Sequence, residues 1–190
     1  MEKRTMWGLI AIVAVIAVLI FAGASYTEEK PYTEEKPSAL ASTEDLEFLR
    51  WASVTSDRLA DHEADLWATG LYDLELYFND SDEADFSLVD LERLFDNVEF
   101  HAGRLYDDAK KALDEIDQFS VSPKLQPCKD EYKLALQDLM AFAYFAGLGV
   151  RTNDPDDMKI ADEYFESSKE HFESSYEHFE SFESSMLGAF

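Results

Sequence analysis

Hydrophobic residues recur with a period of seven along most of the chain after residue 42. The clearest case is residues 88–119, where two apolar series with this spacing are offset by three residues. They are Leu88, Phe95, Ala102, Ala109 and Ile116, and Leu91, Val98, Leu105, Ala112 and Phe119. Such series are the a and d positions of a heptad repeat, which form the buried seam of a left-handed helical bundle. The pattern therefore predicts a long helix with one face in a bundle core.

A second heptad pattern covers residues 158–186, where nearly the same seven residues are repeated. One seam position carries large side chains and the other mostly small ones: Met158, Phe165, Phe172, Phe179 and Met186, against Ala161, Ser168, Ser175 and Phe182. Large residues that alternate with small ones let facing helices interdigitate. Packing therefore explains the phenylalanines. Asp154, Pro155 and the two acids that follow predict where this helix begins.

Two further helices complete the pattern. Ser42 and Asp45 form a capping-box sequence at the start of a helix that is expected to run to about Phe78. Pro127 is expected at the first position of another helix, which extends to about residue 150. Four amphipathic helices with short connections predict an all-α fold, an antiparallel up-down four-helix bundle over residues 42–190. No segment has the alternating pattern of a strand.

The amino terminus has the pattern of a membrane segment. Lys3 and Arg4 precede an uncharged apolar run, 6–24, which is long enough to cross a bilayer core of about 30 Å. We predict a transmembrane signal-anchor helix at 6–25 in the cell membrane, with residues 1–5 in the cytoplasm and the bundle extracytoplasmic. The alternative is a signal peptide cleaved after Ala24, because the sequence Ala-Gly-Ala at 22–24 fits a cleavage site.

Residues 26–41 separate this segment from the bundle. They contain the hexapeptide YTEEKP twice in tandem. Pro31 and Pro37 disfavour helix in the residues before them, and the charges keep the segment solvated. The sequence therefore predicts an extended acidic linker.

Charge limits the partners that the protein can have. The chain has 41 acidic and 16 basic residues, a net charge of −25 and a pI near 4.2. Nucleic-acid binding is excluded, because contacts with phosphates require a Lys/Arg footprint. Disorder is also excluded, since 46% of the residues are hydrophobic and 14% aromatic. The single cysteine, Cys128, is interpreted as a small buried hydrophobe, with an intermolecular disulfide as the alternative.

Motifs for catalysis, cofactors or metals are missing from the sequence. His171 and His178 are seven residues apart, about 10.5 Å along a helix, which is too far for one ion. No Glu-x-x-His pair of di-iron bundles occurs. His62 and His101 stand alone, and no nucleophile or nucleotide-binding motif is present. We therefore expect no enzyme, no cofactor and no metal site. The glutamates between residues 163 and 183 are interpreted as a solvated face; the alternative is a weak surface for cations or a basic partner.

The helix that begins near Pro127 is apolar on all sides from residue 139 to 150. If Leu139 and Phe142 lie on the bundle seam, then Met140, Tyr144 and Phe145 must point elsewhere. Bulky side chains of neighbouring helices could cover them, or they could form an exposed surface for a protein partner or for self-association. Met140, Tyr144 and Phe145 are therefore the candidate partner-binding residues.

The segment LQPCKDEYKLALQDLMAFAYFAGLG, which follows a basic and apolar amino terminus, resembles small uncharacterised membrane-anchored proteins of archaea, methanogens especially. The resemblance implies an exported helical domain. Together the patterns predict a non-enzymatic, membrane-tethered acidic bundle that binds a protein or cell-envelope partner outside the cell. The alternative is an extracytoplasmic bundle that binds a small ligand or metal as a receptor or carrier.

Overall fold

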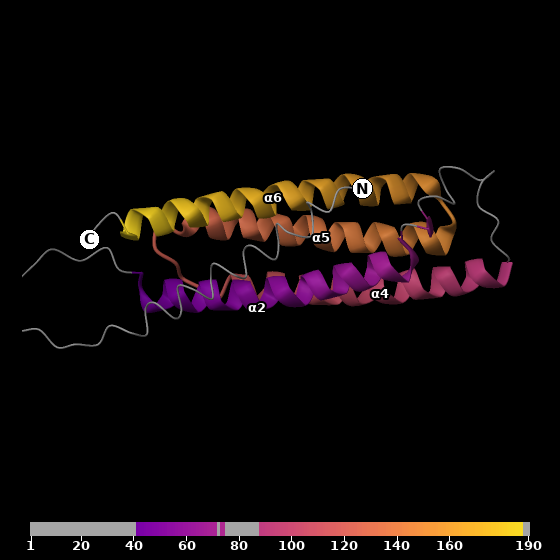
Figure 1. The fold of residues 1–190 in the computed structure, drawn as a ribbon, viewed down its shortest axis with the longest axis horizontal. Helices are drawn as coiled ribbons and strands as arrows, with labels where there is room; N and C mark the ends of the chain where they lie inside the picture. Colours follow the sequence, from indigo (N-terminus) through magenta and orange to yellow (C-terminus); the bar gives the residue numbers. More distant parts are fainter. Residues whose placement is uncertain (1–40, 72, 75–87, 188–190) are drawn as a thin grey trace, which may run out of the picture.

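The computed structural model describes residues 41–71, 73–74 and 88–187. Within these ranges the chain is all helical and contains no strand. The four long helices are α2 (Thr43–Leu66), α4 (Leu88–Ile116), α5 (Gln126–Thr152) and α6 (Pro155–Leu187), and a short π-helix, η1 (Trp67–Leu71), follows α2. The long helices pack side by side along one axis (Figure 1). This confirms the predicted all-α bundle.

Cross-helix pairs give the direction of each helix. Pairs between α2 and α4 include Trp51–Glu115, Arg58–Asp108 and Asp65–His101. Glu99 of α4 and Asp117, directly after α4, pair with Arg151 and Lys133 of α5. Pairs between α5 and α6 include Cys128–Ser175 and Asp138–Ser167. In each set the residue number rises on one helix as it falls on the next. Successive helices therefore run antiparallel, as the ribbon also shows (Figure 1).

The core follows the predicted seams. On α4, the fully buried residues are Val98, Ala102, Leu105, Ala109, Ala112 and Ile116. On α6, Phe165, Phe172, Phe179 and Phe182 are buried, and so are the small residues Ala161, Ser168 and Ser175. Leu139 and Phe142 of α5 also lie in the core, as expected. The alanines of α4 let α5 approach closely, so that a Cβ added at Gly147 would lie 3.7 Å from the Cβ of Ala102.

The predicted capping box begins α2. The backbone N–H of Asp45 donates to Ser42 Oγ at 3.0 Å, and that of Ser42 donates to Asp45 Oδ2 at 3.1 Å. The other carboxylate oxygen of buried Asp45 accepts the backbone N–H of Ser122 at 2.7 Å. The cap therefore also ties the start of α2 to the connection between α4 and α5.

The start of α5 is one residue earlier than expected, at Gln126, so Pro127 lies in its first turn. α6 begins at Pro155, as predicted, and Asp154 Oδ1 accepts the N–H of Asp156 at 2.9 Å.

The expectation that the first helix runs unbroken to about Phe78 is wrong. α2 ends at Leu66, and Gly70 within η1 has φ 131°, a conformation that no helical residue adopts. Gly70 also packs against Leu94 of α4, where a Cβ would overlap the leucine side chain. The break therefore follows from a close approach to α4, which the hydrophobic periodicity alone does not reveal.

The predicted membrane segment 6–25, and the linker up to residue 40, lie outside the described residues. Among the helices of the described ranges, none combines the length and the apolar character that crossing a membrane requires.

Candidate functional site

The candidate residues of α5 lie on its two flanks. Tyr144, which faces α4, is 53% exposed. Phe145 faces α6 and is half-buried. Met140 is half-buried and packs against the core. Of the three candidates, Tyr144 thus presents the largest fraction of its surface to solvent.

Ring contacts connect Tyr144 and Phe145 of α5 to one tyrosine on α4 and one on α6. The rings of Tyr106 on α4 and Tyr144 lie 6.3 Å apart, and those of Tyr144 and Phe145 lie 5.3 Å apart. Phe145 in turn stacks on Tyr164 of α6 at 5.7 Å and 7°. Tyr106, Tyr144, Phe145 and Tyr164 are called the aromatic strip below. Sequence reasoning found the two members on α5 and missed Tyr106 and Tyr164, because the seven-residue pattern does not say which outer residues of neighbouring helices meet.

A groove of about 150 Å³ lies between α4 and α5 beside this strip. Its lining residues are Glu99, Ala102, Gly103, Tyr106, Ala143, Tyr144, Gly147, Leu148 and Arg151. Ala102, Ala143 and Gly147 are buried, and the two tyrosines and Leu148 stand beside them. Glu99 Oε1 accepts hydrogen bonds from Nε and Nη2 of Arg151 at 2.9 and 2.7 Å. The groove is thus apolar inside and carries one ion pair in its lining.

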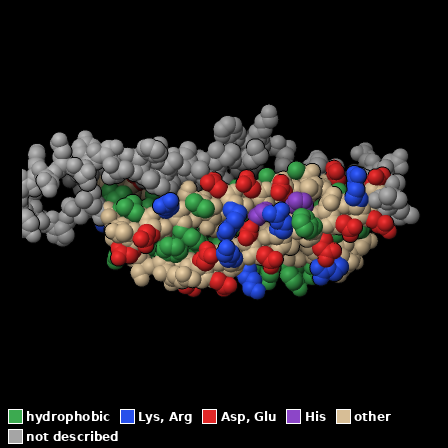
Figure 2. All heavy atoms as spheres, turned by 90° about the horizontal axis from the view of Figure 1, so that it is seen from below, with side chains coloured by type: hydrophobic (Ala, Val, Ile, Leu, Met, Phe, Trp, Pro, Cys, Tyr) green, Lys and Arg blue, Asp and Glu red, His purple; other side chains and the backbone are tan. Residues whose placement is uncertain are grey.

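The helices differ strongly in surface charge. α6 has eight exposed acids and one exposed cation, and α2 (Thr43–Leu66) has five and one. α4 has five exposed acids and four exposed cations, and α5 has one of each. Figure 2, which shows the side of α2 and α4, has Lys and Arg side chains interspersed among the acids near its middle. The groove and three rings of the aromatic strip therefore lie on the two helices with nearly balanced charge, whereas Tyr164 lies on acidic α6.

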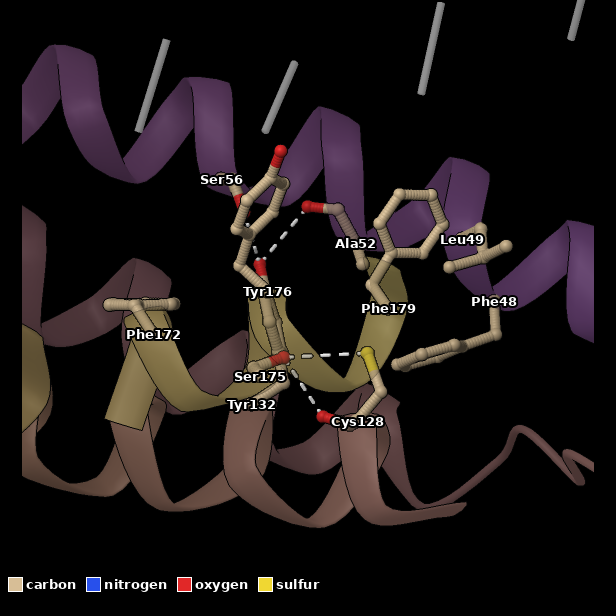
Figure 3. Close-up of a pocket in the computed structure, with 10 residues that line it drawn as sticks. All are labelled: Phe48, Leu49, Ala52, Ser56, Cys128, Tyr132, Phe172, Ser175, Tyr176 and Phe179. Carbon is tan, nitrogen blue, oxygen red and sulfur yellow. Dashed lines mark hydrogen bonds between the residues drawn. The ribbon is translucent and has the colours of Figure 1, made fainter. Parts of the chain in front are cut away.

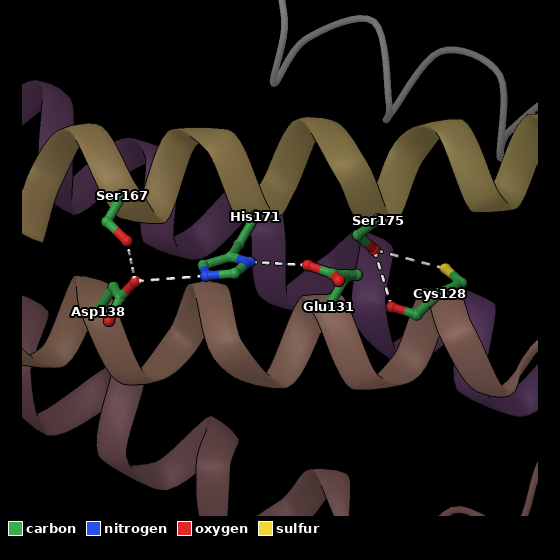
Figure 4. A network of polar contacts seen from close by, with 6 residues as sticks. All are labelled: Cys128, Glu131, Asp138, Ser167, His171 and Ser175. Carbon is green, nitrogen blue, oxygen red and sulfur yellow. Dashed lines mark hydrogen bonds and ion pairs between the residues drawn. The ribbon is translucent and has the colours of Figure 1, made fainter.

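A polar network joins α5 and α6 (Figure 4). His171 Nδ1 bonds Glu131 Oε2 at 2.7 Å, and His171 Nε2 lies 3.8 Å from Asp138 Oδ2. Ser167 Oγ donates to the same Asp138 oxygen at 2.6 Å. In a nucleophilic triad the imidazole stands between the serine and the acid. Here Asp138 stands between Ser167 and His171, so the group beside the Ser167 hydroxyl is a carboxylate and the arrangement is not that of a serine–histidine–acid triad.

Two histidines that stand alone in the sequence have partners across the α2–α4 seam. His62 Nε2 bonds Asp108 Oδ2 at 2.6 Å, and Arg58 Nε lies 3.7 Å from the same oxygen. His101 Nδ1 lies 4.0 Å from Asp65 Oδ2. Each histidine therefore faces an aspartate on the other helix. Only the register of α2 against α4 brings these residues together.

A small cavity of about 20 Å³ lies among α2, α5 and α6 (Figure 3). It holds no more than about one water molecule. Buried Cys128 lines it and contacts Ser175 Oγ at 3.4 Å, and burial raises the pKa of its thiol to about 11. A thiol with so high a pKa is unreactive near neutral pH, as expected for a buried hydrophobe.

Glu63 on α2 is a half-buried carboxyl near Trp67 and Lys169. Burial raises its pKa from 4.5 to about 7, although the Lys169 charge and a hydrogen bond with Trp67 oppose this. Desolvation thus outweighs the two attractive contacts. A carboxyl that titrates near pH 7 has no signal in the sequence, where Glu63 is one acid among 41.

Metal-ligating side chains do not gather in the described ranges: nowhere in them do three or more His, Cys, Asp or Glu side chains lie so that they could hold an ion. His178 is half-buried on α6, and the glutamates around it are mostly exposed.

The fold and the site define an acidic helical bundle with an aromatic strip that runs across α4, α5 and α6. Comparisons of the chain with protein-family models, curated proteins and solved structures gave no match.

Proposed function

We propose that this chain is a membrane-tethered binding protein whose aromatic strip receives a protein partner outside the cell. The observation that carries the proposal is the continuous row of rings from Tyr106 to Tyr164. Exposed aromatic groups that lie together on a soluble surface are typical of interaction sites. Tyrosine in particular is enriched in the energetically important centres of protein interfaces.

The rings are also held in position before any partner arrives. Tyr144 is flanked by Tyr106 and Phe145, and Phe145 stacks on Tyr164. Ring contacts of this kind restrict the side-chain rotamers, so less conformational entropy is lost on binding.

The tether is part of the proposal. Lys3 and Arg4 before the apolar run 6–24 support an anchor whose bundle lies outside the cell. Intact mass of the native protein tests it, and a mature chain that begins at Ser25 would contradict a retained anchor.

Site-specific photocrosslinking tests the binding role. A photoreactive phenylalanine analogue replaces Tyr144 in the full chain, which is produced in the cells that naturally make the protein. Illumination of membranes from these cells is expected to crosslink the chain to one protein of defined mass. The matched control carries the analogue at exposed Glu173 of α6, which lies outside the strip. Adducts of equal yield at both positions, or none at Tyr144, would contradict the proposal.

A charge in the strip gives a second test. Tyr144→Glu is expected to abolish the adduct formed from an analogue at Tyr164 while the helical circular dichroism stays unchanged. Tyr144 suits this test better than Phe145, because Phe145 also packs against the core. An adduct of undiminished yield in the variant would count against the strip as the site.

A further inference from the structure

Gly103 leaves an opening on α4 that nothing in the described chain fills. A Cβ added there would meet no atom within 4 Å, apart from its own helix backbone and chain neighbours. Glycine within a helix is less stable than alanine. Alanine at position 103 would therefore fit and would stabilise α4. The chain instead has glycine there, which leaves this part of the groove open.

A protruding ring lies one helical turn away on the same helix. Phe100 is 61% exposed, its ring meets that of His101 edge-on at 5.1 Å, and the Arg104 guanidinium lies 5.9 Å from its centre. The groove volume of about 150 Å³ matches that of a protein cavity known to hold a benzene ring. α4 thus carries both an exposed phenyl ring and an opening of the size that a phenyl ring needs.

Surface charge decides which partner is favoured. Two copies of a chain with net charge −25 repel each other. The repulsion is weakest where α4 and α5 meet, because their exposed charges nearly balance, whereas α6 exposes eight acids against one cation. A basic partner would instead be drawn to α6 or α2. A face that is balanced in charge and rich in exposed aromatic groups fits a second copy of the same chain.

We infer that two copies associate through their α4–α5 faces about a two-fold axis, with Phe100 of each copy in the groove over Gly103 of the other. In a two-fold symmetric interface every contact between the copies occurs twice. Phe100 of each copy therefore enters the groove of the other. The inference rests on the proposed function, since it takes a second copy as the partner that covers Tyr106 and Tyr144.

Sedimentation equilibrium of the full chain in detergent micelles tests the inference. We expect a dimer whose dissociation constant falls by about ten-fold between 0.05 and 0.5 M NaCl, because salt screens the repulsion between acidic copies. A monomer at every salt and protein concentration would overturn the inference. So would a dimer that salt weakens, because attraction between opposite charges would then hold it together.

Two substitutions distinguish dimerisation through this interface from association through other surfaces, including the apolar amino terminus. Gly103→Leu fills the groove, and Phe100→Ala removes the ring; each is expected to weaken dimerisation by about 100-fold, as for a central interface residue. Gly103→Leu should also leave the thermal midpoint unchanged or raise it. The matched controls on α2 are Ala64→Leu and Val54→Ala, where Val54 is also 61% exposed. Equal dimerisation of all four variants would overturn the inference.

Cysteine crosslinking tests the pairing itself. Chains with Phe100→Cys are mixed with chains with Gly103→Cys and treated with a copper–phenanthroline oxidant. The mixture is expected to form disulfide dimers faster than either variant alone, whereas equal rates would contradict the pairing.

The inference and the proposed function can fail separately. A monomeric chain that still gives an adduct with another protein at Tyr144 retains the proposed function and overturns the dimer. If the chain forms no dimer and also gives no adduct at Tyr144, the inference and the proposed function are both overturned.

Discussion

Tyr132 connects α5 to α2 through the centre of the bundle. Its hydroxyl donates to the carbonyl oxygen of Ala52 at 3.0 Å and accepts from Ser56 Oγ at 2.8 Å, and the residue is buried. Its ring meets those of Phe48 and Phe172 edge-on. A single polar atom of α5 thus satisfies two polar groups of α2 inside the core.

Replacing Tyr132 with Phe should lower the free energy of unfolding by about 1–3 kcal/mol, because the Ser56 hydroxyl and the Ala52 carbonyl lose their partner in the core. Urea unfolding followed by circular dichroism measures the change. Tyr144→Phe is the control, since the structure gives that hydroxyl no hydrogen bond in the described ranges, and its effect should stay within about 0.5 kcal/mol. Equal effects of the two substitutions would contradict the assignment.

Glu63 makes stability depend on pH. Its folded-state pKa is raised to about 7, so the folded protein holds a proton that the unfolded chain releases above pH 4.5. The contribution of Glu63 to stability is therefore fully present below pH 4.5 and is lost as pH rises through 7.

Glu63→Gln should remove this fall and make the protein more stable than wild type at pH 8, by on the order of 1 kcal/mol after allowance for solvent screening. Thermal midpoints at pH 5, 6, 7 and 8 test this. Glu173→Gln, on the exposed face of α6, removes the same charge and serves as the control. Parallel curves for wild type and Glu63→Gln would show that Glu63 does not titrate near neutrality.

At the scale of elements, two glycines have opposite roles. Gly70 ends the helical path after α2 with φ 131° and lies against Leu94, whereas Gly103 has helical geometry and open space around it.

Gly70→Ala should destabilise the fold by about 1–3 kcal/mol, because a non-glycine residue at that φ is strained. Gly103→Ala should stabilise it by about 0.5–1 kcal/mol, because alanine is the better helix former. Urea midpoints of the two single variants measure both effects, and a shift in the same direction would contradict one of the two backbone arguments.

α5 shows how a helix segment that is apolar on all sides can be accommodated in this bundle. Its inner face fills the core through Leu139, Phe142 and Ala146. Of the remaining bulky residues, Met140 and Phe145 are covered in part, and Tyr144 is left exposed. The heptad pattern was sufficient to separate the seam residues from the others, but the degree of covering depends on Tyr106 and Tyr164 of the neighbouring helices.

At the scale of the molecule, charge opposes the compact state. The chain carries −25, and α6 places eight exposed acids on one helix. Repulsion of this kind is screened within about 8–10 Å at ordinary salt. The thermal midpoint should therefore rise by several degrees from 0.02 to 0.5 M NaCl, as measured by circular dichroism. Potassium fluoride is the control for specific chloride binding, and a midpoint independent of salt would contradict a role for repulsion.

The sequence by itself determined the helices, their buried faces and the starts of α2 and α6. Heptad spacing, alternating residue size and the Ser42–Asp45 and Asp154–Pro155 signals are local, so they act before distant segments meet. It also identified Met140, Tyr144 and Phe145 as residues outside the seam.

Only the tertiary structure decided which outer residues face one another. The Tyr106–Tyr144 contact, the His62–Asp108 bond, the groove over Gly103 and the raised pKa of Glu63 all depend on helix register and on the depth of burial. Many registers bury the same apolar seams, because the heptad pattern recurs every seven residues, which is every two helical turns. The specific packing of side chains across each helix pair selects one of them, and that selection brings these groups together.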